Sequence, residues 1–194
     1  MNAPKLFYDT EPKNIIPRDG EAIYHGPIFD GRSSDNYLNV LLEIIPFRND
    51  ERVMYGKHII AKRKIAWYGK KHAWPKVLLE IKKKVESVAG VTYESCLLNL
   101  YEDGSCGLGW HNDEESISHD SSIASLSFGE ERRFDLRYIG TKETVSVILE
   151  HGALLIMKGI IQKYWEHHIP KSKKILGPRI NITFRKRNTE RGTV

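Results

Sequence analysis

Cysteine is scarce in this sequence, which contains only Cys96 and Cys106 among its 194 residues. Two cysteines cannot build the disulfide framework of small secreted domains, so we expect a reducing compartment. The opening residues, MNAPKLFYDTEPK, lack a charged stretch followed by an apolar one, and no apolar run approaches the ~20 residues that span a bilayer. We therefore expect no secretory signal, no membrane partner, and a location in the cytoplasm, nucleus or nucleoid.

Internal repeats and low-complexity tracts are also missing. With 40% hydrophobic and 28% charged residues, the chain has the ordinary composition of one folded domain with a substantial core. We expect a monomer. The formal net charge of +5 is compatible with a polyanionic partner, but a soluble protein of any function could carry it.

Two helices are predicted after a segment rich in proline and glycine. Residues 1–32 are interpreted as an extended arm with one short hairpin near Asp19-Gly20. The first helix follows from cap residues at 33–35 and stops at Pro46, and the second occupies residues 75–90. Each helix carries one apolar stripe at helical spacing, which predicts packing against a core.

From Thr92 onward, short β-rich segments separated by turn residues replace the helical pattern. Several closely spaced short strands predict a barrel or a double-sheet jelly roll. Helices followed by strands make an α+β domain, predicted here over residues 33–194, with the N-terminal helices packed on one outer face.

His111 and Asp113 form the first part of a candidate metal site. Residues two apart on an extended chain point to the same side, so both side chains can hold one ion. Two imidazoles and one carboxylate leave coordination positions open, which suits a non-haem Fe(II) oxygenase better than a closed structural zinc site.

The third ligand is less clearly marked. His167 and His168 are adjacent, so only one of them can face a cavity from a strand, and we prefer His167. His119 and His151 are the other candidates, and their positions beside a loop and a turn glycine favour surface or supporting roles.

The last predicted strand, residues 179–185, alternates strictly between polar and apolar side chains. Its polar face consists of Arg179, Asn181, Thr183 and Arg185. This face could simply meet water, but in a jelly roll it can line the interior. Two interior arginines require anions, and a guanidinium fork matches a carboxylate, so a carboxylate-bearing co-substrate is expected. Asn99 and Tyr101, two apart on an earlier strand, are predicted to hydrogen-bond the same acid.

Taken together, these features resemble the AlkB-type family of Fe(II)- and 2-oxoglutarate-dependent dioxygenases, and above all its branch that repairs alkylated nucleic acid bases. The resemblance runs from about Tyr55 to Arg187. The segments that carry it are Asn99–Tyr101, His111–Glu115, Ile123–Gly129, Trp165–Pro170 and Pro178–Arg185.

The resemblance implies a double-stranded β-helix that uses Fe(II), 2-oxoglutarate and O2. It implies that iron is held by His111, Asp113 and His167, and that Arg185 belongs to the catalytic set with them. The residues that it assigns to 2-oxoglutarate are Asn99, Tyr101, Arg179, Asn181 and Arg185.

Basic and aromatic side chains are interleaved in residues 50–75. From spacing alone this segment is equally well an outer hairpin, but the resemblance implies a nucleotide-recognition lid, with Tyr55 as a wedge between bases. Glu115 is expected to read the edge of an alkylated base. The complete set of predicted substrate contacts is Tyr55, Lys62, Arg63, Lys64, Trp67, Tyr68, Trp74 and Glu115.

The sequence therefore predicts Fe(II)- and 2-oxoglutarate-dependent oxidative dealkylation of N-alkylated bases in DNA, with RNA as an alternative substrate. Aldehyde, succinate and CO2 would be released. The rival hypotheses are an oxygenase that acts on modified RNA, a protein side chain or a small molecule, and a non-catalytic nucleic-acid-binding module on the same fold.

Overall fold

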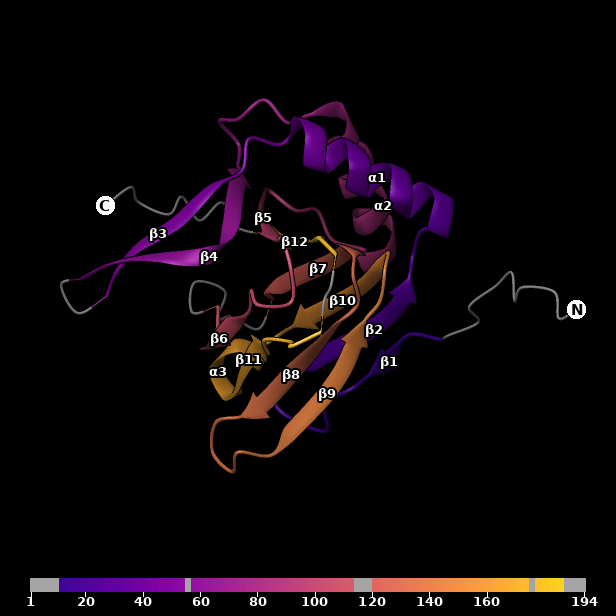
Figure 1. The fold of residues 1–194 in the computed structure, drawn as a ribbon. Coiled ribbons are helices and arrows are strands. Elements are labelled where there is room, and N and C mark those ends of the chain that lie inside the picture. The colour runs from indigo at the N-terminus through magenta and orange to yellow at the C-terminus, as the bar shows by residue number, and fades with distance from the viewer. Residues whose placement is uncertain (1–10, 55–56, 114–119, 175–176, 187–194) are drawn as a thin grey trace, which may run out of the picture.

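A computed structural model describes residues 11–54, 57–113, 120–174 and 177–186, without the side chains of residues 52–60. Within this part of the chain the strands form two antiparallel sheets (Figure 1). The larger sheet contains, in spatial order, β1 (Lys13–Asn14), β2 (Glu21–Pro27), β10 (Ala153–Lys158), β7 (Ser122–Gly129), β12 (Arg179–Arg185), β5 (Ser95–Tyr101), β4 (Lys57–Tyr68) and β3 (Arg48–Met54). The smaller sheet contains β6 (Leu108–His111), β11 (Trp165–Ile169), β8 (Arg132–Tyr138) and β9 (Thr144–Leu149). This arrangement agrees with the predicted jelly-roll core.

In the described ranges, two long helices and one short one accompany the sheets: α1 (Gly31–Ile44), α2 (Lys76–Ala89) and α3 (Ile161–Tyr164). Helix α2 occupies the predicted position between Pro75 and Gly90. Helix α1 begins earlier than predicted, because Asp30 is its cap and accepts a hydrogen bond from the backbone N of Ser33 at 2.7 Å. None of the helices in the described ranges is long and apolar enough to cross a membrane.

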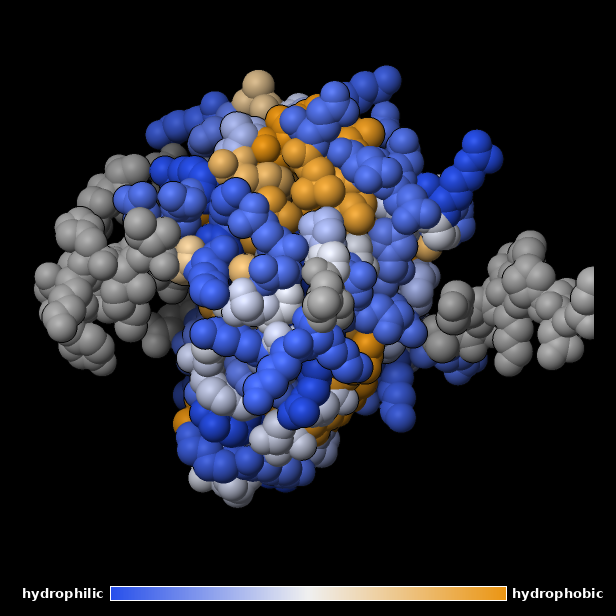
Figure 2. Space-filling view, in the orientation of Figure 1, coloured by the Kyte–Doolittle hydropathy of each residue, from blue (hydrophilic) through white to orange (hydrophobic). Residues whose placement is uncertain are grey.

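The apolar faces of α1 and α2 pack against one face of the larger sheet. Helix α1 contacts both β7 and α2. Leu41 from α1 and Leu78 from α2 are fully buried in the same cluster as Leu98 and Ile182 of the sheet. Figure 2 shows apolar side chains gathered at the top of the molecule, where Figure 1 places these helices. The helices therefore leave the opposite face of the sheet available to enclose a site.

Strand β12 lies in the middle of the larger sheet, between β5 and β7. Ile180, Ile182 and Phe184 join the helix-side core, as the alternating pattern predicts. The polar side chains of the strand are on the other face, and all seven residues are buried. The alternative interpretation, in which the polar face meets water, is therefore wrong.

Of the described residues before α1, Lys13–Asn14 and Glu21–Pro27 belong to the larger sheet, which differs from the predicted extended arm over residues 1–32. Strand β1 pairs with β2 in a hairpin, and β2 also pairs with β10. The turn contains Asp19 (φ 56°) and Gly20 (φ 125°), at the position where the sequence predicts a hairpin. A Cβ atom at Gly20 would meet Ile161, so the close approach of the turn to α3 requires glycine. The described part of residues 1–32 is thus extended but continuous with the domain.

Candidate active site

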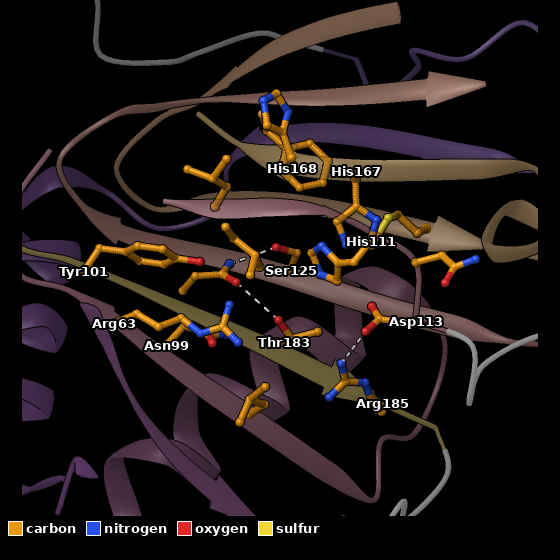
Figure 3. Close-up of a pocket in the computed structure, with 17 residues that line it drawn as sticks. Arg63, Asn99, Tyr101, His111, Asp113, Ser125, His167, His168, Thr183 and Arg185 are labelled. Carbon is orange, nitrogen blue, oxygen red and sulfur yellow. Dashed lines mark hydrogen bonds and ion pairs between the residues drawn. The ribbon is translucent and has the colours of Figure 1, made fainter. Parts of the chain in front are cut away.

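A cavity of about 490 Å³ lies between the polar face of the larger sheet and the smaller sheet (Figure 3). Strands β4, β5, β7, β10 and β12 supply one wall, and strands β6, β8 and β11 supply the other. The predicted site residues that line the cavity are Arg63, Asn99, Tyr101, His111, Asp113, His167, Asn181 and Arg185. Residues from five separate strands and one loop are thereby brought together.

His111 and His167 lie directly opposite each other on the paired strands β6 and β11. Their ring centroids are 4.3 Å apart. The Nδ1 atom of His111 is 2.9 Å from the carbonyl oxygen of Gly109, which can only accept, so Nδ1 carries the proton and Nε2 is the atom with a lone pair. Burial lowers the pKa of His167 to about 4. His167 is therefore neutral at physiological pH, as a metal ligand must be.

His168 has partners other than those of its neighbour. Its ring stacks on Trp110 with centroids 3.9 Å apart, and its Nδ1 lies 3.4 Å from a carboxylate oxygen of Asp135. His168 borders the cavity, but its ring contacts Trp110 on β6 and Asp135 on β8 rather than the other predicted ligands. His151 accepts a hydrogen bond from the backbone N of Gly129 at 2.7 Å and belongs to a separate turn. His119 lies outside the described residues.

Asp113 follows β6, and its carboxylate is held by Arg185 at 2.7 Å. Its backbone N donates to Oε1 of Gln162, while the side chain of Asn112 donates to the carbonyl oxygen of the same glutamine. Burial alone would raise the pKa of Asp113, but the charge of Arg185, which is the largest opposing influence, brings the pKa below its usual value. The carboxylate is therefore ionised, and Gln162 is a supporting residue that the sequence did not indicate.

The donor types at this place fit a ferrous ion, since two imidazoles and an ionised carboxylate are the set that Fe(II) oxygenases use. Figure 3 shows Asp113 turned toward Arg185 rather than between the two imidazoles. Accordingly, no cluster of three His, Cys, Asp or Glu residues in metal-binding proximity is found in the part of the chain that the structure describes. The chemistry of the site fits iron, while the carboxylate is engaged by an arginine.

Arg179 is a buried cation beside the cavity. The residue is 1% exposed, and its Nη2 atom donates to Oγ of Ser127 at 2.9 Å. Burial lowers the pKa of Arg179 to about 10, so the guanidinium remains charged at neutral pH. Its Nε and Nη1 atoms have no hydrogen-bond partner among the described residues. Unsatisfied buried donors on a cation are costly, and an incoming carboxylate next to Tyr101 would satisfy them.

Asn99 and Asn181 differ in what they offer a ligand. The Oδ1 atom of Asn99 is buried without a hydrogen-bond partner in the described part of the chain. Asn181 instead donates from Nδ2 to Ser125 and to the carbonyl oxygen of Leu126, and its Oδ1 accepts from Thr183. Both donor positions of the Asn181 amide are therefore used within the protein, while its Oδ1 can accept a second hydrogen bond. Ser125 and Ser127 hold Asn181 and Arg179 in place. The two serines are two residues apart on β7, and this spacing in the sequence could have indicated that both face the site.

The predicted basic contacts separate into two kinds. Lys62 and Lys64 are surface residues whose ammonium groups lie 3.3 Å from Ser105 and 2.7 Å from Glu102. Arg63 is buried and forms an ion pair with Asp50 at the cavity wall. The side chain of Arg63 thus lines the site rather than the surface, and Arg63 stays a predicted substrate contact.

The predicted stacking aromatics also separate. Tyr68 is 8% exposed and lies in the core cluster beneath the helices, and Trp74 packs against the same cluster while donating to the carbonyl oxygen of Gly69. Neither can stack on a base in the cavity, so these two predictions are wrong. Trp67 pairs across the strands with Leu97, which lines the cavity, and cross-strand partners share a face. Tyr55 and Glu115 lie outside the described residues.

Known proteins share this architecture. The fold and the cavity define a class of protein, a jelly roll whose site combines imidazole, carboxylate and guanidinium groups. The family model for the 2OG-Fe(II) oxygenase superfamily matches residues 43–185. The chain belongs to this superfamily and, within it, to the AlkB-type family.

Individual relatives support the assignment. Human alpha-ketoglutarate-dependent dioxygenase alkB homolog 3 is 33% identical over 181 residues, which cover 80% of this chain and 62% of the relative. The mouse protein of the same name is 32% identical over 221 residues, covering 94% and 76%. Bovine DNA oxidative demethylase ALKBH2 is 38% identical over 122 residues, covering 58% and 44%. The chain thus spans about three fifths of the human relative's length.

A solved structure shows the same fold. The structure of OsALKBH1 matches with a TM-score of 0.62 and 17% sequence identity. The match covers 88% of this chain and 99% of that one. At this identity the likeness concerns the fold alone.

Proposed function

We propose that this chain is an Fe(II)- and 2-oxoglutarate-dependent dioxygenase that oxidatively dealkylates N-alkylated bases in DNA. The observation that carries the proposal is one cavity lined by His111, Asp113, His167 and Arg185, with the buried Arg179 on the same strand as Arg185. The relatives are named as an alpha-ketoglutarate-dependent dioxygenase and a DNA oxidative demethylase, which supports both the reaction class and the substrate.

In this proposal, His111, His167 and Asp113 hold the ferrous ion at one end of the cavity. Fe(II), together with 2-oxoglutarate and O2, supplies the oxidising power that hydroxylates an N-alkyl group, with succinate and CO2 as by-products. Gln162 fixes the backbone of Asp113, and Phe134 packs against the ring of His167 with centroids 5.3 Å apart. These contacts limit the movement of the ligands.

The arginines orient 2-oxoglutarate. Arg179, supported by Ser127 and beside Tyr101, suits the distal carboxylate because its unused donors require an anion. We assign the keto acid end to Arg185, which holds the carboxylate of Asp113, and Asn99, which lines the same cavity, stays a predicted contact of the co-substrate. Asn181, which Ser125 and Thr183 hold in place, lines the same cavity and stays a predicted contact of the co-substrate.

The substrate would enter from the side of β4 and the loop after β6. Trp67 offers an aromatic surface, Lys62 and Lys64 offer charges for phosphates, and Tyr55 and Glu115 remain predicted contacts. After hydroxylation, the N-hydroxymethyl group breaks its carbon–nitrogen bond. The hydroxyl proton is lost, the ring nitrogen recovers the bonding pair, and formaldehyde leaves.

Formaldehyde and succinate release from an oligonucleotide with one N3-methylcytosine tests the proposal, with Fe(II), 2-oxoglutarate and ascorbate present. DNA and RNA versions of one sequence, single- and double-stranded, separate the substrate classes, and Asp113→Ala is the inactive control. Equal amounts of the two products from DNA would support the proposal. Turnover on RNA alone, or slow succinate formation without formaldehyde, would show that N-alkylated DNA is not the substrate.

A further inference from the structure

Arg132, the first residue of β8, is a buried cation that is 4% exposed. Its Nη2 atom donates to the carbonyl oxygens of Cys106 and Pro170, both at 2.7 Å, and its Nη1 atom donates to that of Asp103 at 3.4 Å. The carboxylate of Asp103 accepts instead from the backbone N of Ser105 at 2.7 Å. In the part of the chain that the structure describes, Arg132 is thus held by carbonyl oxygens and not by a carboxylate. Carbonyl groups satisfy its donors but do not neutralise its charge.

The carbonyl groups that Arg132 binds lie on two connections between the sheets. Residues 102–107 lead from β5 to β6, and Pro170 begins the connection from β11 to β12. Strands β6 and β11 carry the two imidazoles of the site, whereas β5 and β12 carry the predicted contacts of 2-oxoglutarate. Each connection therefore joins an imidazole of the site to the co-substrate side of the cavity, and Arg132 is bonded to both connections.

The two connections also pack closely on each other. The backbone N of Ser172 donates to the carbonyl oxygen of Gly104 at 2.7 Å. A Cβ atom at Gly104 would lie 2.8 Å from the carbonyl oxygen of Lys174, so the backbones could not approach in this way with a larger residue. Because its donors reach both segments, the planar fork of Arg132 fixes the spacing between them.

Arg132 and Arg179 share one aromatic neighbour. Their Cζ atoms lie 5.8 and 5.2 Å from the centroid of the Tyr101 ring. Arg179 keeps the buried donors Nε and Nη1 without a partner, whereas Arg132 has no such unused buried donor among the described residues. The two cations therefore differ in what they can do. Arg179 can bind an incoming carboxylate, and Arg132 can place positive charge and backbone around it.

We propose that Arg132 is a positioning residue of the 2-oxoglutarate subsite. Its fork holds the two connections at a fixed spacing, so that Tyr101 and Arg179 form one binding place for the distal carboxylate. Its charge, which forms no ion pair with a carboxylate of the described residues, adds to the attraction of this place for an anion. The inference rests on the proposed function and extends it to a residue that acts without touching the co-substrate.

The test compares the binding of 2-oxoglutarate with that of 2-oxopentanoate, which has the same chain length and a methyl group in place of the distal carboxylate. Titration calorimetry of Fe(II)-loaded protein under nitrogen gives both dissociation constants, the weaker one by displacement. Their ratio measures the preference for the distal carboxylate. A variant that only loosens the structure weakens both ligands and leaves this ratio unchanged.

The substitutions of Arg132 separate its charge from its hydrogen bonds. Arg132→Gln keeps an amide donor for the carbonyl oxygens, and Arg132→Met keeps only the length of the stem. Each should lower the preference for 2-oxoglutarate about tenfold, the effect of one unit charge about 10 Å away at an effective dielectric of 20. Arg132→Lys keeps the charge and should stay within about threefold of the wild type. Arg133→Gln removes a neighbouring arginine whose side chain is 57% exposed, and it is the matched control with an unchanged ratio.

Melting curves show which of the two uncharged variants folds, and either one gives the decision. An unchanged ratio in a folded Arg132→Gln or Arg132→Met protein would overturn the inference, even if both ligands bound more weakly. A loss of preference in Arg132→Lys as large as in Arg132→Gln would also overturn it, because the charge would then have no effect. Failure of the wild-type protein to bind 2-oxoglutarate would instead contradict the proposed function itself.

Discussion

The carboxylate of Asp113 accepts a hydrogen bond from Nη2 of Arg185 at 2.7 Å, although 72 residues separate them in the chain. Asp113 follows a strand of the smaller sheet, and Arg185 ends the central strand of the larger one. Their contact therefore joins the two walls of the cavity and holds the carboxylate ionised.

Arg185→Met is expected to lower kcat/KM for 2-oxoglutarate by about 100-fold, the size of a lost charge-assisted hydrogen bond to a buried group. Arg185→Lys keeps the charge without the fork and should recover part of that loss. Initial rates of succinate formation measure the effect, and melting curves of the two variants show whether they fold alike. If the Arg185→Met, Arg185→Lys and wild-type proteins were equally active, Arg185 would have no role in binding 2-oxoglutarate.

The adjacent histidines on β11 should differ sharply on substitution. His167→Ala is expected to abolish iron-dependent turnover, because this ring faces His111 across the paired strands. His168→Ala should keep most of the activity and lose some thermal stability, since it removes the stack on Trp110. Fe(II) titration followed by fluorescence provides a readout independent of turnover. The reverse pattern would refute the ligand assignment.

Substitution of Arg179 should weaken the binding of 2-oxoglutarate without affecting the binding of DNA. Arg179→Lys is expected to raise the KM for 2-oxoglutarate at least tenfold, while the KM for DNA changes little, because the fixed fork beside Ser127 is lost. The measurement is succinate formation as a function of 2-oxoglutarate concentration at saturating DNA. A parallel rise in both KM values would indicate a general structural defect instead.

Gly129 is expected to be essential for stability at the end of β7. It has φ 93°, and a Cβ atom there would collide with the carbonyl oxygen of Pro178, directly before Arg179. Gly129→Ala should therefore cost about 2 kcal/mol or more in the free energy of unfolding. Gly31→Ala, where a Cβ atom meets open space, is the matched control. Chemical denaturation of both variants measures the difference.

Much of the fold and site followed from local patterns. The alternation of residues 179–185 gave both faces of the central strand, and the spacing of His111 and Asp113 placed two side chains in one cavity. Patterns of period two and residue chemistry are local properties, so a single sequence reveals them.

The remaining features depend on pairing between distant strands. Tyr68 and Trp67 differ only in which face they occupy, and that is set by the register of β4 against β5. The inward turn of Arg63 depends on a bulge opposite Asp50, and the place of β2 in the larger sheet depends on β10, more than a hundred residues later. No local pattern specifies these contacts.

The central claim is tested most directly by mass spectrometry of a single-stranded DNA oligonucleotide with one N3-methylcytosine. The wild-type protein with Fe(II), 2-oxoglutarate and O2 should convert it to the unmodified oligonucleotide, with one methylene less in mass. His167→Ala and Asp113→Ala should leave it unchanged. Complete retention of the methyl group by folded, iron-loaded wild-type protein would contradict the account.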